Sequence, residues 1–515
     1  MNKKTLFLFL LIIVYHVAYS QISPSEGNKI NFRLIGFSFP AMKKVNNYTV
    51  EIASGNYNSE DSFKNNIAST LKSETNRITG EVPFWGSDYT WRVAYTGNDS
   101  KITKSALHHF STIFPHSLDT GKFRFLITTK AKQFKDAFVF LDAGRALYDM
   151  EGNAVWYLPN VEGITNERTS VRDLKMSPQG TITFLVGSRT NNTAYEMDYN
   201  GKILWQAPNN GKISGDTIEH YHHELTKLKN GNYMILASDF VPLQWRIFSP
   251  KDSGLFIASS DSTKPTIRTT NYEKSPFGTV IEYDSKGKIV WSWKSSDYFK
   301  GKDLQNHITL EMRKDTVDDH ENAFFFDEKN SIIYLSFKNT SVLFKLKYPG
   351  GELINSYGNT SWTDARPGSS PVFCGQHGCK LSDDGKLYMY NNYECNIDSV
   401  PELLVLQEPD SKNGSLKKLW EYKYPLSDIE KQKKKNLSSG GNIIELPGHA
   451  MFASMGTPYS GVFIVSEDKK LLWDGHYERY MKRENRWKEI STYRASIIEN
   501  RKDLEKLIWN GEQDK

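Results

Sequence analysis

Hydrophobic and polar residues alternate along much of the chain in short runs that end at Gly, Asn or Asp, as in β-strands joined by tight turns. Three of these runs share a further feature. Each places a Gly four residues before a Trp, after a turn that contains Asp: YDMEGNAVW (148–156), MDYNGKILW (197–205) and EYDSKGKIVW (282–291). Each run therefore predicts a β-hairpin.

The hairpin recurs in weaker form at 347–356, 409–420 and 466–473. A strand, turn and strand precede every copy but the first, which gives about four strands per unit of roughly 40 to 60 residues. This spacing predicts an all-β fold with a six-bladed β-propeller over residues 131–515. An array of β-sandwiches is the alternative, although sandwiches do not ordinarily repeat such a hairpin. The first unit is incomplete, and residues 491–509 supply a candidate strand to close it, although the last stretch of this segment could equally be a short helix.

The N-terminal part of the chain lacks the repeat. Residues 1–20 combine Lys3 and Lys4 with an apolar run and a small-residue site, as in a cleaved export signal. We expect a periplasmic or secreted protein without a membrane anchor. Residues 21–130 hold alternating, aromatic-rich runs that predict a small β-sandwich-like domain.

Charge and composition exclude some functions. Without Lys3 and Lys4 the formal charge falls from +5 to +3, and the basic and acidic residues are interspersed. No basic stripe for nucleic acid is present in this sequence. Aromatic residues make up 13% of the chain, which argues against a disordered protein. Association as a homodimer stays open.

Three histidines occupy similar places in successive units. His223 precedes the turn residue Gly231 by eight positions, His377 precedes Gly385 by eight, and His320 precedes Glu328 by eight. In a propeller the first strand of each blade lines the central channel, so the three imidazoles are expected to converge. A structural role, hydrogen-bonded to nearby backbone, is the preferred interpretation for any one of them, but three histidines in register make it the less favoured one.

Cysteines near one of these histidines allow two interpretations. Cys374 and Cys379 flank His377, and such residues are metal ligands, but the spacing matches no zinc module. In an exported protein a Cys374–Cys379 disulfide is the better interpretation, which leaves Cys395 unpaired.

The segments HHELTKLKNGNYMILA, DDHENAFFFDEKNSIIYLSFKNTSVLFKL and QHGCKLSDDGKLYMYNN resemble successive motifs of the bacterial arylsulfate sulfotransferases. The likeness covers about residues 135–500. It implies a six-bladed propeller behind a small β-domain, and an exported enzyme that moves a sulfuryl group between phenols without a nucleotide donor, cofactor or metal. Its partners would be an aryl sulfate donor and a phenolic acceptor.

The resemblance also implies roles for individual residues. His377 matches the histidine that takes the sulfuryl group, in a ping-pong reaction through a sulfohistidine. His223 and His320 match two further catalytic histidines, with His222 as the alternative to His223. Asn322 matches a substrate-binding residue, and Lys338 stands where the family usually has arginine. Lysine supplies a point charge instead of a planar fork.

Two other functions remain open from the sequence. A propeller that only binds a ligand in its channel would use the same aromatic and histidine side chains. A metal-dependent hydrolase or lyase would use the same imidazoles as ligands.

Overall fold

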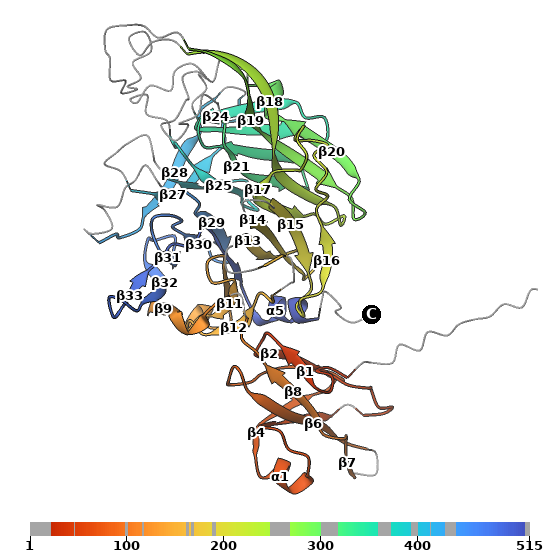
Figure 1. The fold of residues 1–515 in the computed structure, drawn as a ribbon. Helices are drawn as coiled ribbons and strands as arrows, with labels where there is room; N and C mark the ends of the chain where they lie inside the picture. The colour runs from red at the N-terminus through yellow and green to blue at the C-terminus, as the bar shows by residue number, and fades with distance from the viewer. Residues whose placement is uncertain are drawn as a thin grey trace, which may run out of the picture. The chain divides into compact units, whose positions relative to one another are not determined.

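The computed structural model describes residues 22–45, 47–97, 101–115, 118–160, 164–165, 169–187, 192–247, 268–299, 318–358, 372–392, 400–411, 414–427 and 439–509. The chain divides into two compact units, Met1–Ile113 and Phe114–Lys515, and the described residues of both are nearly all β (Figure 1). The expected export signal at 1–20 lies outside the described residues. Among the described helices, none has the length and apolar character needed to cross a membrane.

The first unit contains two described sheets and one short helix. One sheet has the order β1-β8-β6-β3-β4 with β7 on β6, and the other pairs β2 with β5. Their aromatic faces meet where the ring of Phe37 packs 5.1 Å from Trp91 and 6.2 Å from Phe110. The bounds are β1 Asn28–Ile30, β2 Leu34–Ser38, β3 Tyr48–Ser54, α1 Glu60–Lys64, β4 Ile67–Ser73, β5 Arg77–Glu81, β6 Asp88–Thr96, β7 Ile102–Lys104 and β8 His108–Thr112.

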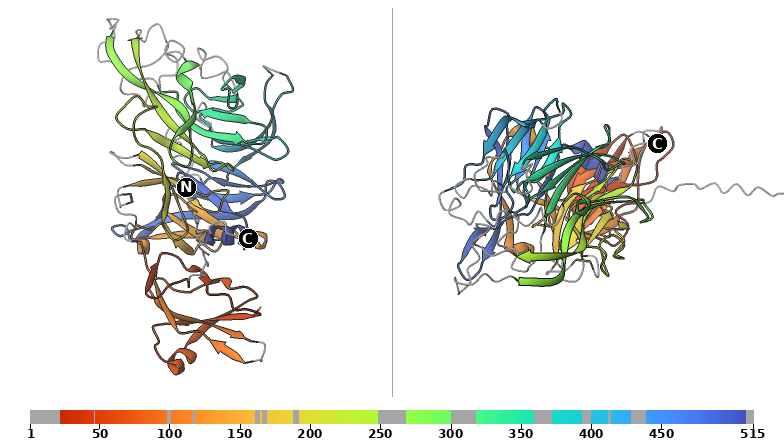
Figure 2. Two further views of the ribbon diagram at one scale, coloured as in Figure 1. Left: turned by 90° about the vertical axis from the view of Figure 1, so that its right-hand side faces the viewer. Right: turned by 90° about the horizontal axis from the view of Figure 1, so that it is seen from above.

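The described strands of the second unit form six antiparallel sheets, numbered here in chain order (Figures 1 and 2). Sheet 1 is β12-β11-β10-β34, with β10 Phe138–Leu141, β11 Ala146–Asp149, β12 Ala154–Tyr157 and β34 Ala495–Ile498. Sheet 2 contains β13 Ser170–Met176, β14 Ile182–Gly187, β15 Asn192–Met197 and β16 Ile203–Gln206. Sheet 3 contains β17 Tyr221–Lys227, β18 Tyr233–Ile247, β19 Arg268–Tyr283 and β20 Ile289–Lys294.

Sheets 4 to 6 repeat the arrangement. Sheet 4 contains β21 Glu321–Asp327, β22 Ile332–Phe337, β23 Val342–Lys347 and β24 Leu353–Gly358. Sheet 5 contains β25 His377–Leu381, β26 Leu387–Asn391, β27 Glu402–Gln407 and β28 Lys417–Lys423. Sheet 6 contains β29 Asn442–Leu446, β30 Ala450–Ser454, β31 Gly461–Val465, β32 Leu471–Met481 and β33 Arg486–Glu489, with β9 Phe123–Thr129 on β32. The short helices are η1 Thr120–Lys122, η2 Lys132–Phe134, η3 Ser295–Asp297 and α5 Arg501–Ile508.

The end of the chain completes sheet 1. Strand β34 pairs antiparallel with β10, with Phe138 opposite Ile498 and Leu141 opposite Ala495. Helix α5 follows, and the Asn500 side chain caps its N-terminus. The closing strand expected within 491–509 is present, and the last stretch forms the helix that the sequence left as an alternative.

The first strands of neighbouring sheets lie beside one another. Strand β13 contacts β34, and β17, β21, β25 and β29 follow in chain order, each beside its predecessor; β30 then contacts β34. Hydrophobic cores fill the spaces between consecutive sheets, for example where Leu236 of sheet 3 and Phe344 of sheet 4 belong to one buried cluster. The innermost strands are thus brought to a common centre.

The tryptophans of the repeat link consecutive sheets. The indole N–H of Trp156 in sheet 1 donates to the carbonyl of Tyr199 in sheet 2 at 2.9 Å. Trp473 in sheet 6 donates to Met150 O in sheet 1 at 3.0 Å, which joins the last sheet to the first. The same bond joins sheets 3 and 4, from Trp291 to Pro349, and sheets 5 and 6, from Trp420 to Glu467. Hairpin tryptophans therefore join four of the six pairs of neighbouring described sheets by this bond. Trp205 of sheet 2 instead stacks on Tyr233 of sheet 3, with ring centroids 3.7 Å apart.

Candidate active site

The pairing register shifts near the starts of three innermost strands, close to the histidines: between Tyr221 and Leu225 in β17, just after His320 in β21, and between His377 and Cys379 in β25. His223 and His320 have φ of 59° and 53°, in the left-handed region that side-chain-bearing residues rarely occupy. In β25 the corresponding left-handed residue is Gly378, with φ 66°, one residue after His377. Such irregularities re-aim the neighbouring side chains. A left-handed non-glycine residue costs about 1–3 kcal/mol, so packing must hold His223 and His320 in place.

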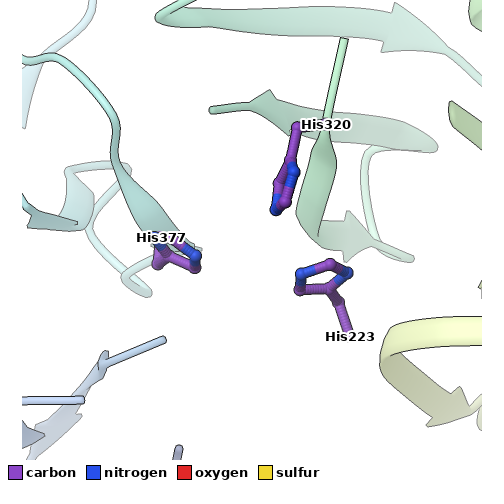
Figure 3. A group of neighbouring side chains, drawn as sticks. All are labelled: His223, His320 and His377. Carbon is purple, nitrogen blue, oxygen red and sulfur yellow. The ribbon is translucent and has the colours of Figure 1, made fainter. Parts of the chain in front are cut away.

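The three imidazoles converge, as the sequence predicted (Figure 3). One ring nitrogen from each of His223, His320 and His377 lies within 4.8 Å of the other two. The ring centroid of His223 is 5.2 Å from that of His320 and 6.4 Å from that of His377. His222 lies behind this cluster, with its Nδ1 2.8 Å from Nδ1 of His223. His223, and not the alternative His222, is therefore the member of the cluster.

A polar neighbour faces Nδ1 of each clustered histidine. Nδ1 of His377 lies 2.7 Å from Oδ1 of Asn392. Nδ1 of His223 lies 2.8 Å from Nδ1 of His222, and Nδ1 of His320 lies 3.4 Å from a carboxylate oxygen of Asp318. These contacts fix the ring orientations and leave the Nε2 atoms as the ones that turn toward the centre.

The Asn392 contact determines the tautomer of His377. The amide nitrogen of Asn392 donates to Gly440 O at 3.4 Å, so its oxygen faces the imidazole and accepts a proton from Nδ1. The lone pair of His377 is then on Nε2. This atom is buried, and among the described residues it has no hydrogen-bond partner. A buried nitrogen with a free lone pair can act as a nucleophile. Leaving it without a hydrogen bond raises the free energy of the folded protein, and a group bound to this nitrogen would offset that cost.

The surroundings keep His377 and His223 neutral. Burial lowers the pKa of His377 well below its usual value, and the nearby positive charge of Lys338 lowers it further. Burial together with the neighbouring imidazoles does the same to the pKa of His223. A neutral imidazole retains the lone pair that nucleophilic attack requires.

Lys338 and Asn322 both lie at this site. Lys338 follows β22, is only 7% exposed, and its amide donates to His320 O at 2.9 Å. Its ammonium is close enough to His377 to affect the pKa of that imidazole. Asn322 is fully buried, and its side-chain nitrogen donates to Gln376 O at 2.6 Å, directly before His377. Its oxygen has no partner among the described residues, so it offers the site a hydrogen-bond acceptor.

Arg494 was not singled out from the sequence. Its guanidinium donates to the backbone carbonyls of His223 at 3.1 Å and Asn322 at 2.8 Å. Carboxylates of Asp173 and Glu224 lie 3.3 and 3.4 Å from its Nη1. Arg494 precedes β34, so the segment that completes sheet 1 also holds the backbone of two site residues.

Tyr493 is a second site residue that the sequence did not predict. Its ring centroid lies 6.0 Å from that of His223 and 6.4 Å from that of His377, and the guanidinium of Arg172 sits over its face. The hydroxyl is buried with no partner in the described part of the chain. The sequence did contain a signal for Tyr493. Residues 491–509 were expected to supply a strand that closes the first sheet, and such a strand lies near the centre where the histidines meet.

The Cys374–Cys379 disulfide expected from the sequence is wrong. Cys379 is a free, buried thiol, and burial raises its pKa to about 12. Because Cys379 lies in β25, its side chain enters the hydrophobic core between sheets 4 and 5. Cys374 precedes the strand, and its amide donates to the Asn391 side chain. Cys374 is disulfide-bonded, and the third cysteine of the chain, Cys395, lies outside the described residues.

Comparison with known proteins identifies the family. A family model described as Arylsulfotransferase (ASST) matches residues 124–242 and 247–471, well over half of the sequence. The chain belongs to this family, and membership implies a sulfotransferase enzyme with arylsulfotransferase activity in general. No curated protein matches the chain significantly.

Solved structures show only distant likeness. A protein assigned as a 6-phosphogluconolactonase from Bacteroides fragilis is 11% identical, with 89% of this chain and 99% of that chain covered and a TM-score of 0.31. A protein from Lactobacillus plantarum is 10% identical, with 73% and 99% covered and a TM-score of 0.34. Likeness at this level carries no argument about function.

Proposed function

We propose that this protein is an exported aryl-sulfate sulfotransferase that moves a sulfuryl group from a phenolic sulfate ester to a phenolic acceptor through a sulfohistidine at His377. The observation that carries the proposal is the buried Nε2 of His377, whose lone pair faces two other histidines and has no partner among the described residues. Family membership supports the reaction class.

In the first half-reaction the Nε2 lone pair of His377 attacks the sulfur of the aryl sulfate. The sulfur–oxygen bond to the aryl group breaks, and its electron pair leaves with the phenolate oxygen. Sulfuryl transfer resembles phosphoryl transfer in spreading charge over equatorial oxygens, so positioning and cationic groups supply most of the catalysis. Lys338 is the cation closest to this role, because its charge acts on His377.

The proton on Nδ1 of His377 makes the intermediate reactive. Attack by this tautomer leaves a positive imidazole ring bonded to the negative sulfuryl group. The proton stays on Nδ1, and the N–H donates a hydrogen bond to Asn392 Oδ1. A positive ring is a better leaving group than a neutral one, so the sulfuryl group is ready to move on. No proton has to leave the ring in either step.

His320 is the residue best placed to handle the phenolic proton. Its Nδ1 lies 3.4 Å from a carboxylate oxygen of Asp318, which holds the ring in place, and its side chain is 27% exposed. Starting with a proton on each ring nitrogen, it gives the Nε2 proton to the departing phenolate. It then takes the proton of the acceptor phenol as that oxygen attacks sulfur, which restores its starting form. The electron pair of the nitrogen–sulfur bond returns to His377. His223 packs against both rings and supports their placement, and the Asn322 oxygen accepts a hydrogen bond from the phenolic hydroxyl.

The wider organisation forms part of the proposal. The six sheets would be the blades of a propeller, with β34 closing the first blade, and the two sheets of the first unit would form a small β-sandwich. Inner-strand neighbours and the Trp473 bond between sheets 6 and 1 support the ring. Residues 1–20 would direct export and be removed, which N-terminal sequencing of the exported protein tests directly.

The experiment that tests the function uses a chromogenic phenyl sulfate with and without added phenol. Phenol-stimulated release of the chromophore, with sulfated phenol as product, is expected for the wild type, with loss of release in His377→Ala. Release that does not depend on phenol would identify a sulfatase. No release from several aryl sulfates by folded protein would contradict the proposal.

A further inference from the structure

The histidine cluster has a second chemical property that sulfuryl transfer does not use. Histidines that bind metals present one ring nitrogen to the ion and have the other held by a carboxylate, a carbonyl or another polar group. All three clustered rings are held in this way through Nδ1, by Asn392, Asp318 and His222. The free nitrogens lie within 4.8 Å of one another.

We propose that His223, His320 and His377 form a binding site for one borderline-soft divalent transition metal ion such as Zn²⁺, and that the bound ion inhibits the enzyme. The site goes beyond the proposed function, and only its inhibitory effect rests on that function.

The ligand set determines the class of ion. Neutral imidazoles suit Zn²⁺, Cu²⁺ and Ni²⁺, whereas Ca²⁺ and Mg²⁺ require oxygen ligands. Three histidines with a fourth position left open form one of the known zinc arrangements. Zinc–nitrogen bonds of about 2.0–2.1 Å bring ligand nitrogens closer together than 4.8 Å, so binding draws the rings inward by about 1 Å.

Charges around the cluster are balanced enough to admit a dication. Lys338 and Arg494 oppose it, but Arg494 is paired with Asp173 and Glu224. The Asp318 carboxylate lies behind His320 and strengthens that ligand. The partly exposed side chain of His320 gives the ion a route to the buried His377.

Metal binding and sulfuryl transfer exclude each other because both use one electron pair. The Nε2 lone pair of His377 bonds either to the ion or to sulfur. A bound ion also fills the space that the sulfuryl oxygens need, so inhibition is expected to be competitive with the aryl sulfate and to be reversed by a chelator.

The test uses untagged, chelator-treated protein and two readouts. Zn²⁺ titration by calorimetry is expected to give one site per chain, and Co²⁺ is expected to give the visible absorption of a tetrahedral site. His320→Gln and His377→Gln each remove a ligand and should weaken Zn²⁺ binding by more than about 10-fold. Asn392→Ala keeps all ligands and should weaken binding by about 10- to 100-fold. His449→Ala, at an exposed histidine outside the cluster, is the matched control and should bind as the wild type does.

Each outcome bears on the proposal. If the wild type binds Zn²⁺ no more tightly than the two glutamine variants do, and all three proteins have normal thermal transitions, the proposed site is refuted. Tight binding with unchanged transfer activity would overturn the inhibition. Because calorimetry does not depend on turnover, a protein without sulfotransferase activity that still binds Zn²⁺ at these histidines would refute the proposed function and support the site.

Discussion

Oδ1 of Asn392 lies 2.7 Å from Nδ1 of His377 and fixes which nitrogen of that imidazole carries the proton. Asn392 directly follows β26, the strand paired with β25, so the hairpin itself delivers the orienting group. The proposed reaction depends on this contact because it directs the Nε2 lone pair toward the other two histidines.

Removing the Asn392 contact should slow transfer without unfolding the protein. Asn392→Ala frees the His377 ring to rotate and to carry its proton on either nitrogen, so kcat should fall by about 10- to 100-fold, as when outer-shell partners of other sites are lost. Steady-state kinetics and a thermal melt check this. Asn230→Ala, in the exposed β17–β18 turn, is the control and should keep full activity.

A charge at the same position should shift the pH profile. The carboxylate in Asn392→Asp still accepts from Nδ1 and also stabilises the imidazolium, so the pKa of His377 should rise. Activity would then be lost at a higher pH as the solution is acidified. An acid limb at the wild-type position would show that His377 does not have to be neutral.

Lys338 should act through its charge. Lys338→Met removes the cation beside the sulfuryl position, and kcat should fall by about 100-fold or more, as when one donor to a developing anion is deleted. The pKa of His377 should rise as well, because the Lys338 charge lowers it. Lys338→Arg, which introduces the residue usual in the family, should retain activity.

The control for Lys338 is Lys347→Met at an exposed position at the end of β23. It should change neither kcat nor the pH profile. Equal effects at the two lysines would mean that overall charge, and not the place of Lys338, is responsible.

Arg494 should contribute strongly to stability. Arg494→Met removes a cation from the buried carboxylates of Asp173 and Glu224, which keep Lys175 and Lys380 as partners, and it takes a donor from two backbone carbonyls. The free energy of unfolding should fall by about 2–4 kcal/mol. Urea denaturation measures this change. Arg486→Met, at an exposed arginine, should stay within about 0.5 kcal/mol of the wild type.

Acid should destabilise the protein partly through His222. Burial and the neighbouring His320 lower the pKa of His222 in the folded protein to about 4, below the value of about 6.5 for an unfolded chain. Between these values the unfolded chain binds a proton that the folded protein does not, so stability falls as the pH falls from about 6.5 to 4. His222→Gln should flatten this dependence, as followed by denaturation midpoints across that range. An unchanged slope would refute the assignment.

The sequence predicted the repeat well because the Gly-x-x-x-Trp hairpin has a structural function. Its tryptophans contact the next sheet, Trp156 and Trp291 through an indole hydrogen bond and Trp205 by stacking on Tyr233. The histidine spacing led to the right cluster for a less exact reason. Gly231 and Gly385 are the left-handed turn residues of their hairpins, but Ser331, not Glu328, has this role after β21.

Other features of the site depend on contacts that spacing does not encode. Arg494 lies far from His223 along the chain and meets it only because the last strand completes the first sheet. The pairing of Cys374 with Cys379 failed because a strand turns alternate side chains to opposite faces, and Cys379 points into the core.

The most direct test of the central claim is intact-mass analysis of the protein mixed with an aryl sulfate in the absence of acceptor, followed by peptide mapping at neutral pH. The account predicts one sulfuryl group per chain on His377, its absence in His377→Ala, and its removal when phenol is added. Transfer that proceeds while no sulfuryl group appears on the protein, or a sulfuryl group on another residue that phenol removes at the rate of turnover, would contradict it.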